Sequence, residues 1–300
     1  MRHLFIINPA AGKRNSTRRL VEQIQAVFSG GAEVALTSGA GDAERLAAQA
    51  VQRGDQVRIY ACGGDGTLNE VVNGAAGWPN AAVTHVPKGT GNDFLRLFGP
   101  GAARAFSNLA ALRDGPQAQV DLIACNDRLG IDIVCAGVDA WVAADVHRFK
   151  ALPLVNGTGA YLLALAYHVY KGIARPMTVE MGPIHYSGDV TILCVCNGRY
   201  YGGGFMPMGE AQPDDGILDM LLIPKVRRTT FVRLLGAYAK GRYQSYPEII
   251  QDYHGQSLIL SSHRELTAVV DGEPMYAKRF TIRLSEKKIF FFYPAGMFWR

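Results

Sequence analysis

Apolar and polar residues alternate along the first part of the chain in a pattern that predicts strands followed by helices. The apolar runs that predict buried strands lie at residues 4–7, 33–36, 57–62 and 82–86. Between them, residues 18–28 and 42–53 carry apolar side chains at helical spacing. Because strand–helix alternation is typical of a mainly parallel sheet with helices on both faces, we expect an α/β domain over residues 1–119.

After about residue 120 the apolar runs become short and are separated by Gly, Pro and Asp. They lie at residues 120–124, 131–136, 190–196, 217–223, 258–260, 266–270, 280–284 and 289–293. This pattern predicts a second, antiparallel β-rich domain over residues 120–289. Helical segments near 159–171 and 229–240 interrupt it.

Composition and charge narrow the class of protein. The chain has 300 residues, of which 48% are hydrophobic and 19% charged, as in ordinary folded proteins of two domains. The net charge of +5 favours anionic partners such as nucleotide phosphates and acidic lipid head groups, without choosing among them. A basic stripe interleaved with aromatic residues is missing, so nucleic-acid binding is disfavoured.

Apolar runs and cysteines indicate where the protein acts. The longest run, residues 160–169, is shorter than the roughly 18–20 residues that a membrane span needs, and the N-terminus lacks a signal-peptide pattern. We therefore expect a cytoplasmic protein, soluble or peripherally associated with membranes. The five cysteines lack paired spacing, which favours a reducing compartment. Cys194 and Cys196 are expected to pack in the core of a strand.

Three loops follow predicted strands of the first domain, at the sheet edge where α/β proteins bind ligands. They are NPAAGK at 8–13, GGDGTLNEVVNG at 63–74 and PKGTGNDF at 87–94. Glycines in the second loop let a phosphate approach the backbone closely. Thr67 and Glu70 form a capping-box pattern, which predicts a helix starting at Thr67 whose N-terminus attracts anions. One such loop is equally compatible with an ordinary turn, but two at one sheet edge favour a phosphate site.

Acidic residues beside these loops suggest further chemistry. Asp65 would repel a phosphate unless a cation such as Mg²⁺ lay between them. In the β-rich half, PDDGILD at 213–219 is either a surface turn or a site for a hard cation. VVDGE at 269–273 is either a hairpin tip or the position of a general base, with Asp271 and Glu273 on one side if the strand continues.

Two segments of the second domain suggest contact with lipid. Residues 160–169 are apolar nearly all round and predict a core helix, a wall of an acyl-chain site or a membrane-touching face. Basic residues gather on or beside the later helix and either face an anionic membrane or are plain solvated charge. They are Arg227, Arg228, Arg233, Lys240 and Arg242.

Taken together, the loops resemble the catalytic domain of diacylglycerol kinases and of their relatives, the sphingosine and ceramide kinases. The arrangement is most similar to the soluble, stand-alone bacterial lipid kinases. GGDG alone also occurs in NAD kinases and phosphofructokinases, whereas GGDGTLNEV combined with GTGNDF is much more specific. The resemblance implies a nucleotide cleft between an α/β domain and an antiparallel β domain, and a return of residues 290–300 to the first domain.

The resemblance also implies roles for individual residues. Nucleotide would be bound by Asn8, Pro9, Ala10, Ala11, Gly12, Thr37, Gly63, Gly64, Asp65, Gly66, Thr67, Leu68, Asn69 and Thr90. Asp65 would serve the catalytic Mg²⁺, Glu70 would cap its own helix, and Glu273 would accept the proton of the lipid hydroxyl. Asp215, with backbone oxygens of Gln212 and Ile217, would hold a structural Mg²⁺. The Gln212-Pro213 pair departs from the residues usual there, which weakens the case for this metal.

These observations predict an ATP-dependent lipid kinase that uses ATP and Mg²⁺, binds a lipid substrate and touches an anionic membrane surface. The alternatives are an NAD-kinase-like phosphotransferase and a non-catalytic module that binds nucleotide or lipid. The identity of the lipid and the oligomeric state stay open at this point.

Overall fold

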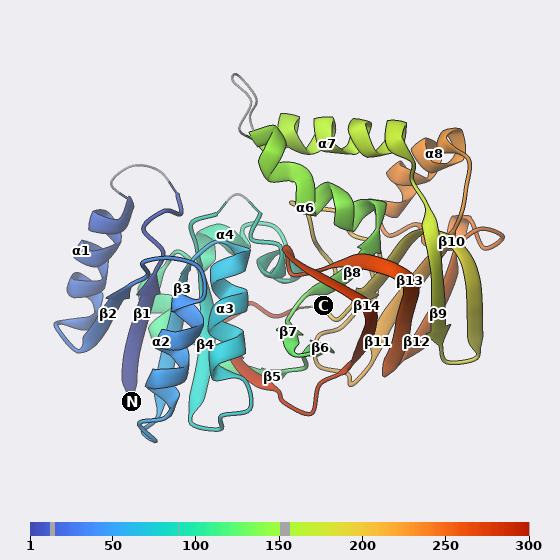
Figure 1. Cartoon of the computed structure of the whole chain (residues 1–300). Coiled ribbons are helices and arrows are strands. Elements are labelled where there is room, and N and C mark those ends of the chain that lie inside the picture. Colours follow the sequence, from blue (N-terminus) through green and yellow to red (C-terminus); the bar gives the residue numbers. More distant parts are fainter. Residues whose placement is uncertain (13–15, 90, 151–156, 300) are drawn as a thin grey trace.

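The computed structural model describes residues 1–12, 16–89, 91–150 and 157–299, which form two sheets with a separate hydrophobic core each. Figure 1 shows the two units side by side, the first coloured blue to cyan and the second mostly green to orange. One sheet is mainly parallel and the other antiparallel. The predicted combination of an α/β domain and a β-rich domain is confirmed.

The first sheet has six strands in the order β2-β1-β3-β4-β15-β5. They are β1 (Arg2–Ile7), β2 (Ala32–Leu36), β3 (Val57–Gly63), β4 (Ala81–Pro87), β5 (Gln117–Val120) and β15 (Ile289–Phe292). Neighbours from β2 to β15 are parallel, and β5 runs antiparallel to β15. Every residue of the central strand β3 is buried, as expected where helices cover both faces.

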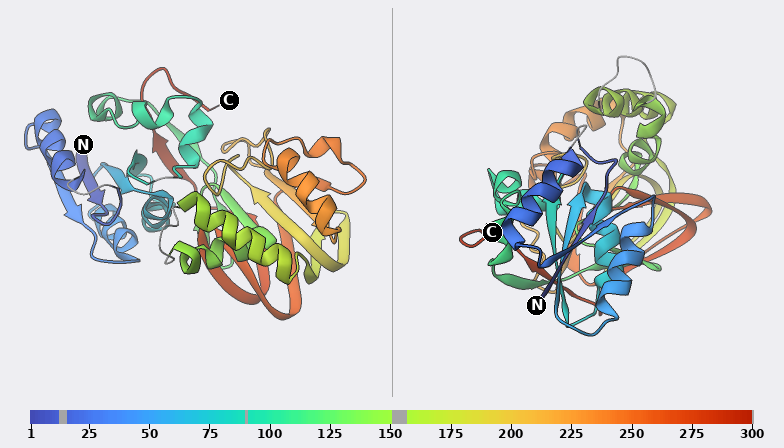
Figure 2. Two further views of the ribbon diagram at one scale, coloured as in Figure 1. Left: turned by 90° about the horizontal axis from the view of Figure 1, so that it is seen from above. Right: turned by 90° about the vertical axis from the view of Figure 1, so that its left-hand side faces the viewer.

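Helices of the first domain are α1 (Ser16–Phe28), α2 (Asp42–Val51), α3 (Asp65–Ala75), η1 (Phe94–Phe98), α4 (Ala102–Ala105) and α5 (Leu109–Arg113). Helix α1 buries Leu20, Ile24 and Phe28, which recur every four residues and so share one face. The right-hand view of Figure 2 shows α1 and α2 on opposite faces of the sheet. This follows from right-handed crossovers, because the chain moves one way from β1 to β2 and the other way from β2 to β3.

The second sheet runs in the order β12-β11-β10-β8-β13-β14-β6-β7, with β9 paired to β10 and β13. Its strands are β6 (Ile123–Cys125), β7 (Arg128–Gly130), β8 (Ile133–Gly137), β9 (Arg175–Met181), β10 (Ile184–Cys196), β11 (Leu218–Pro224), β12 (Gln251–Gly255), β13 (Ser257–Val270) and β14 (Glu273–Leu284). Cys194 and Cys196 are fully buried in β10, as predicted.

Three helices, α6 (Val138–Lys150), α7 (Gly157–Lys171) and α8 (Arg228–Tyr238), lie together beside the second sheet (Figure 1), and a short η2 (Tyr243–Ser245) follows. The sequence pattern did not predict α6. Its first turn, Val138 to Val142, is largely apolar and follows β8 directly, so it resembles the continuation of a buried strand. No helix in the described part of the chain is long and apolar enough to cross a bilayer.

Candidate active site

The glycine-bearing loops meet at the carboxyl edge of the first sheet. Asn8, after β1, donates its backbone N–H to the carbonyl of Cys62 at 3.0 Å, and Thr37, after β2, donates to Ile7 at 2.9 Å. The backbone N–H groups of Lys88 and Gly89, after β4, both donate to the carbonyl of Gly63, at 2.8 and 3.1 Å. The segments predicted to bind nucleotide are therefore neighbours, except that Thr90 lies outside the described residues.

Two of these glycines are required by close backbone packing. A Cβ atom added at Gly89 would lie 2.7 Å from the Cα of Gly64, and one added at Gly63 would lie 2.2 Å from Oγ1 of Thr67. The first loop is tied in as well, because the side-chain amide of Asn8 donates to Thr67 Oγ1 at 3.3 Å and its carbonyl oxygen accepts from Ala10. Gly12, with φ +87°, turns this loop next to Lys88.

Helix α3 starts at Asp65, two residues before the predicted start at Thr67. The predicted capping by Glu70 is wrong. Its carboxylate instead accepts backbone N–H groups of Gly41 and Ala43 at 2.9 and 3.0 Å, and so caps the neighbouring helix α2. Because α3 begins early, Glu70 lies beyond its first turn and points to α2. No side chain of the described residues caps α3, so its first N–H groups are left for an anion.

Asp65 connects the two glycine-bearing loops. Its Oδ2 accepts the backbone N–H of Asn92 at 2.8 Å, and its Oδ1 accepts that of Asp93 at 2.7 Å. Asp93 in turn accepts the backbone N–H of Gly203 at 2.8 Å and pairs with Arg96 at 3.1 Å. Burial and the charge of Asp65 raise the pKa of Asp93 to about 6.

The loop Gly63–Gly66 is called the phosphate loop below, after its predicted role. His85 supports this loop, which the sequence analysis missed. The side chain is fully buried in β4, and its Nε2 lies 3.0 Å from the carbonyl of Gly63. Burial lowers the pKa of His85, so the ring is neutral, and its carbonyl partner requires the proton on Nε2. A polar residue in the middle of the apolar run 82–86 was the signal available in the sequence.

Asn69 joins the two domains. It is fully buried, and its Nδ2 donates to the Leu129 carbonyl at 2.8 Å and to Asp271 Oδ2 at 2.9 Å. Its Oδ1 accepts from the guanidinium of Arg128 at 2.6 Å. Both ends of its amide are thus used by the second domain, and the nucleotide-binding role predicted for Asn69 stays a prediction. Its neighbour Leu68 is also buried and lines a cavity described below.

The VVDGE motif forms a two-residue hairpin turn between β13 and β14. Asp271 and Gly272 have φ of 47° and 93°, the positive values of a turn in which Asp-Gly is favoured. The Asp271 carboxylate accepts backbone N–H groups of Ile131, Asp132 and Ile133 at 2.7 to 3.0 Å. Because the turn interrupts the strand, the condition under which Asp271 and Glu273 would share one side is not met, and the motif is the hairpin tip that was the alternative. Asp271 instead holds the hairpin in place.

Glu273 lies against the phosphate loop of the other domain. A Cβ atom added at Gly66 would lie 3.1 Å from Oε1 of Glu273, a tight contact that shows how closely this carboxylate approaches the loop. The Glu273 side chain is exposed. Two residues more than 200 positions apart in the sequence are thus neighbours in space, and a carboxylate faces the loop that is predicted to bind phosphate.

An apolar cavity of about 580 Å³ extends from this loop into the second domain. Asp65 and Asp93 line its polar end, and α6, α7 and α8 supply apolar walls through Ala143, Val146, Leu162, Leu165 and Leu235. Helix α7 has buried residues, residues that line the cavity and exposed residues, so it is in part the predicted core helix, while its contact with lipid stays a prediction. Ala160 and Ala164 are buried in the core, Tyr161 and Leu165 face the cavity, and Leu163 and Tyr170 are exposed.

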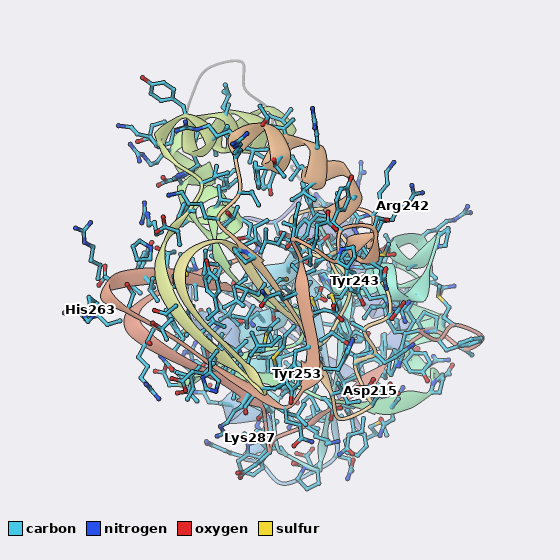
Figure 3. All side chains as sticks on the ribbon, turned by 90° about the vertical axis from the view of Figure 1, so that its right-hand side faces the viewer. Asp215, Arg242, Tyr243, Tyr253, His263 and Lys287 are labelled. Atoms are coloured by element: carbon cyan, nitrogen blue, oxygen red, sulfur yellow. The ribbon has the colours of Figure 1, made fainter. Side chains whose placement is uncertain are left out.

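The predicted structural metal site lies apart from this cavity. Asp215, labelled in Figure 3, is exposed, and its Oδ1 accepts the backbone N–H of Ile217 at 3.0 Å. The same turn contacts Asp121, which accepts the N–H of Gly216 at 2.8 Å. Within the described residues no group of three or more His, Cys, Asp or Glu side chains is placed to hold a metal ion. Asp215 would have to act with backbone oxygens, including those of Gln212 and Ile217, and the site stays a prediction.

Comparisons with known proteins agree with this architecture. Residues 2–125 match the family model described as "Diacylglycerol kinase catalytic domain", and residues 132–287 match "YegS C-terminal NAD kinase beta sandwich-like domain". Two relatives are each named "Probable lipid kinase YegS-like". One, from Pseudomonas putida, is 31% identical and aligns over 88% of this chain and 86% of its own length. The other, from Stenotrophomonas maltophilia, is 32% identical, with coverages of 88% and 87%.

Among solved structures, a crystal structure of a diacylglycerol kinase from Bacillus anthracis aligns with a TM-score of 0.72 over 99% of this chain and 98% of that chain. The sequence identity is 19%, so this likeness concerns the fold alone.

Proposed function

The chain belongs to the family of YegS-like lipid kinases with a diacylglycerol kinase catalytic domain, and on that premise we propose that it transfers the γ-phosphoryl group of ATP to a hydroxyl of diacylglycerol or a related lipid. The observation that supports this most is the continuity of the phosphate loop with an apolar cavity, because Asp65 belongs to both. A nucleotide and a lipid bound in these two places would meet at Asp65 and Glu273.

The nucleotide phosphates are proposed to bind at Gly63–Gly66 and at the N-terminus of α3. Uncapped N–H groups and the positive end of the helix dipole both favour anions there. We extend this site to the loop of Asn8–Gly12, to Thr37 and to Thr90, on the strength of the family resemblance and, for the first two, of their position at the same sheet edge.

Asp65 is the residue that we propose to hold Mg²⁺. Each of its oxygens accepts one backbone N–H, which leaves lone pairs for a cation. Mg²⁺ bound with a nucleotide takes most of its ligands from phosphates and water, so the residues fit without a larger cluster of protein ligands. When bound, the ion would neutralise charge on the transferring phosphoryl group.

Glu273 is the proposed general base. A lipid hydroxyl is a poor nucleophile while protonated, and a carboxylate that takes up its proton speeds the attack by about 10²–10⁴-fold. The hairpin turn held by Asp271 and Asn69 places this carboxylate beside Gly66. Glu273 follows a turn that is anchored to the first domain through Asn69, which suits the role of general base.

We further propose that the protein works at the cytoplasmic surface of a membrane. Leu162, Leu163 and Tyr170 of α7 and Val232 of α8 are exposed apolar side chains near the cavity walls. Arg228 ties the two helices together by donating to the carbonyls of Val169 and Tyr170 at 2.6 and 3.0 Å. Exposed basic residues on and beside α8 supply charge complementary to anionic lipid. Arg242, next to α8, is labelled in Figure 3.

The test is transfer of radiolabelled phosphate from ATP to a panel of lipids in phosphatidylcholine vesicles, with products separated by chromatography. We expect Mg²⁺-dependent labelling of at least one lipid and none of NAD⁺, which is included because the C-terminal domain is described as NAD-kinase-like. Labelling of NAD⁺ alone would replace the lipid kinase with a nucleotide kinase. Nucleotide binding without any transfer would indicate a non-catalytic module.

A further inference from the structure

The guanidinium of Arg128 bridges the two domains. Arg128 begins strand β7 of the second domain, and its Nη1 donates to Oε2 of Glu44 in α2 at 2.6 Å. Its Nη2 and Nε donate to Oδ1 of Asn69 in α3, at 2.6 and 3.2 Å. The side chain is only 25% exposed. One planar group thus joins two helices of the first domain to the second domain, a geometry that suits the fork of Arg and not the single ammonium of Lys.

Helices α2 and α3 present a fixed surface to this guanidinium. A Cβ atom added at Gly74 of α3 would lie 2.2 Å from the carbonyl oxygen of Glu44, so the two helices pack in backbone contact. Glu70 of α3 also caps the N-terminus of α2. Because the helices are joined in these two ways, Glu44 and Asn69 are held at a set separation, and Arg128 binds both at once.

Arg128 also orients the amide of Asn69. Nδ2 of this amide donates to the Leu129 carbonyl at 2.8 Å and to Oδ2 of Asp271 at 2.9 Å. An amide nitrogen only donates and an amide oxygen only accepts, so the donors of Arg128 fix which end of the amide faces Asp271. Asn73 offers the same oxygen a second donor at the longer distance of 3.2 Å. Without Arg128 a turned amide would place its oxygen against the Asp271 carboxylate, which is a repulsive contact.

The hairpin between β13 and β14 meets α3 at two points that are one helical turn apart. Figure 1 shows this hairpin extending from the second sheet toward α3. Asp271 contacts Asn69, and Glu273 lies beside Gly66, which precedes Asn69 by three residues and shares its face of the helix. Two contacts fix the direction of the hairpin as well as its distance from α3. If the contact at Asn69 shifts, the carboxylate of Glu273 moves with the hairpin.

We propose that Arg128 is a positioning residue for phosphoryl transfer, which acts through Asn69 and Asp271 on the general base Glu273. The inference rests on the proposed function, because Glu273 is the base of the proposed reaction. Arg128 is not among the described residues that line the cavity, so the binding of lipid should not depend on it. Its role is to keep the Glu273 carboxylate within hydrogen-bond reach of the lipid hydroxyl. A misplacement of about 1 Å can slow a reaction about 100-fold.

The first test is Arg128→Ala, measured by transfer of radiolabelled phosphate to the best acceptor of the lipid panel. We expect kcat to fall about 10–100-fold, while KM for ATP and KM for the lipid change by less than about threefold. Arg128→Lys keeps the charge but serves one partner at a time, so its kcat should lie between those of wild type and Arg128→Ala. A higher KM with unchanged kcat would assign Arg128 to substrate binding and overturn the inference.

The route through Glu273 is tested by combining Arg128→Ala with Glu273→Gln. The added change should lower the kcat of Glu273→Gln by less than about threefold, because the group that Arg128 positions is already lost. An equal loss in both backgrounds would show that the two residues act independently, and would overturn the inference while leaving the lipid kinase standing. If wild type labels no lipid, the proposed function and the inference fall together. Arg128→Lys takes the place of Arg128→Ala if the alanine variant does not fold.

Arg2→Ala is the matched control, because the ion pairs of Arg2 lie within the first domain. Its Nε contacts Oδ2 of Asp55 at 2.9 Å at the start of β1, the opposite end of the sheet from the phosphate loop. The variant should have a lower melting temperature and a kcat within about threefold of wild type. A fall in kcat as large as that of Arg128→Ala would show that general destabilisation is the cause, and would also overturn the inference.

Discussion

At the edge of the first sheet the groups proposed to face a ligand are mostly backbone, whereas in the cavity of the second domain they are side chains. The edge is built from Gly63, Gly64 and Gly89, and a side chain at Gly63 or Gly89 would clash with its neighbours. The cavity is lined by residues drawn from positions as distant as Asp65 and Gly272. A backbone site suits the phosphates, which every kinase of this type shares. A side-chain site is where the lipid can be chosen, because side chains change without disturbing the fold.

The most damaging change should be Asp65→Asn, because Asp65 is the one carboxylate in the backbone-built loop. It removes the proposed Mg²⁺ ligand and one of two acceptors for the N–H groups of Asn92 and Asp93. We expect kcat to fall about 10³-fold, as when one electrostatic partner of a transition state is lost. Steady-state kinetics with the best acceptor provide the measurement, and circular dichroism checks the fold. A kcat within threefold of wild type would remove Asp65 from the mechanism.

Next in size is Glu273→Gln, which tests the side chain that the second domain extends to the phosphate loop. Lipid phosphorylation should fall at least about 100-fold, the lower end for a lost general base, while ATP binding measured by calorimetry stays near wild type. Glu265→Gln, an exposed residue of β13, is the control. Loss of nucleotide binding with normal turnover of the bound fraction would instead assign Glu273 to the nucleotide site.

Asn69→Ala should weaken the contact between helix α3 of the first domain and the hairpin of the second domain. It leaves the Leu129 carbonyl, Asp271 and Arg128 short of a partner, so we expect a loss of about 1–3 kcal/mol in the free energy of unfolding measured with urea. We also expect lower kcat, because Glu273 depends on the hairpin that Asn69 holds. Asn73→Ala removes contacts to Leu129 and to Asn69 but none to Asp271, so it should spare kcat. If both variants lose kcat equally, Asn69 has no special link to Glu273.

A smaller effect is expected for the pH dependence of stability at Asp93. Its pKa is raised from 3.8 to about 6, so the folded state binds this proton more tightly than the unfolded state. The stability from this group is therefore full below pH 4 and is lost as the pH rises through about 6. Urea unfolding at pH 4 and pH 7 should differ by about 2 kcal/mol more in wild type than in Asp93→Asn, less than the ~3 kcal/mol of the full shift because the unfolded carboxyl is only partly protonated at pH 4. Identical pH profiles of stability for wild type and Asp93→Asn would refute the raised pKa of Asp93.

Asp215→Ala should have the smallest effect, since the loop is exposed and remote from both regions. If this loop binds Mg²⁺, the ion stabilises the folded state by mass action and raises the wild-type melting temperature by a few degrees. The variant should lose that dependence while keeping kcat. If the melting temperature of wild type does not respond to Mg²⁺, the loop at Asp215 is an ordinary surface turn and binds no metal.

Local features of the molecule were predictable from the sequence by itself. The strand–helix alternation, the buried strand β3, the glycine loops and the change to a β-rich second domain each depend on residues within a few positions of one another. Periodicity and turn preferences act at that range, since they arise from backbone geometry and from the burial of one face. The same local signals were misleading where a neighbouring element intervened. Glu70 has the spacing of a cap for its own helix, yet it caps α2, because packing brings the middle of α3 next to the N-terminus of α2.

Only the tertiary structure decided which distant residues form the site. Glu273 approaches Gly66, and Asn69 meets Asp271, across more than 200 residues of sequence. The contact of Asp139 with Tyr201 is likewise invisible in the sequence, where Asp139 is one acidic residue in the helix α6 that the apolar pattern did not predict. These contacts depend on how two sheets and three helices pack against one another. No local spacing encodes that packing, because it is the outcome of burying all the apolar faces at once.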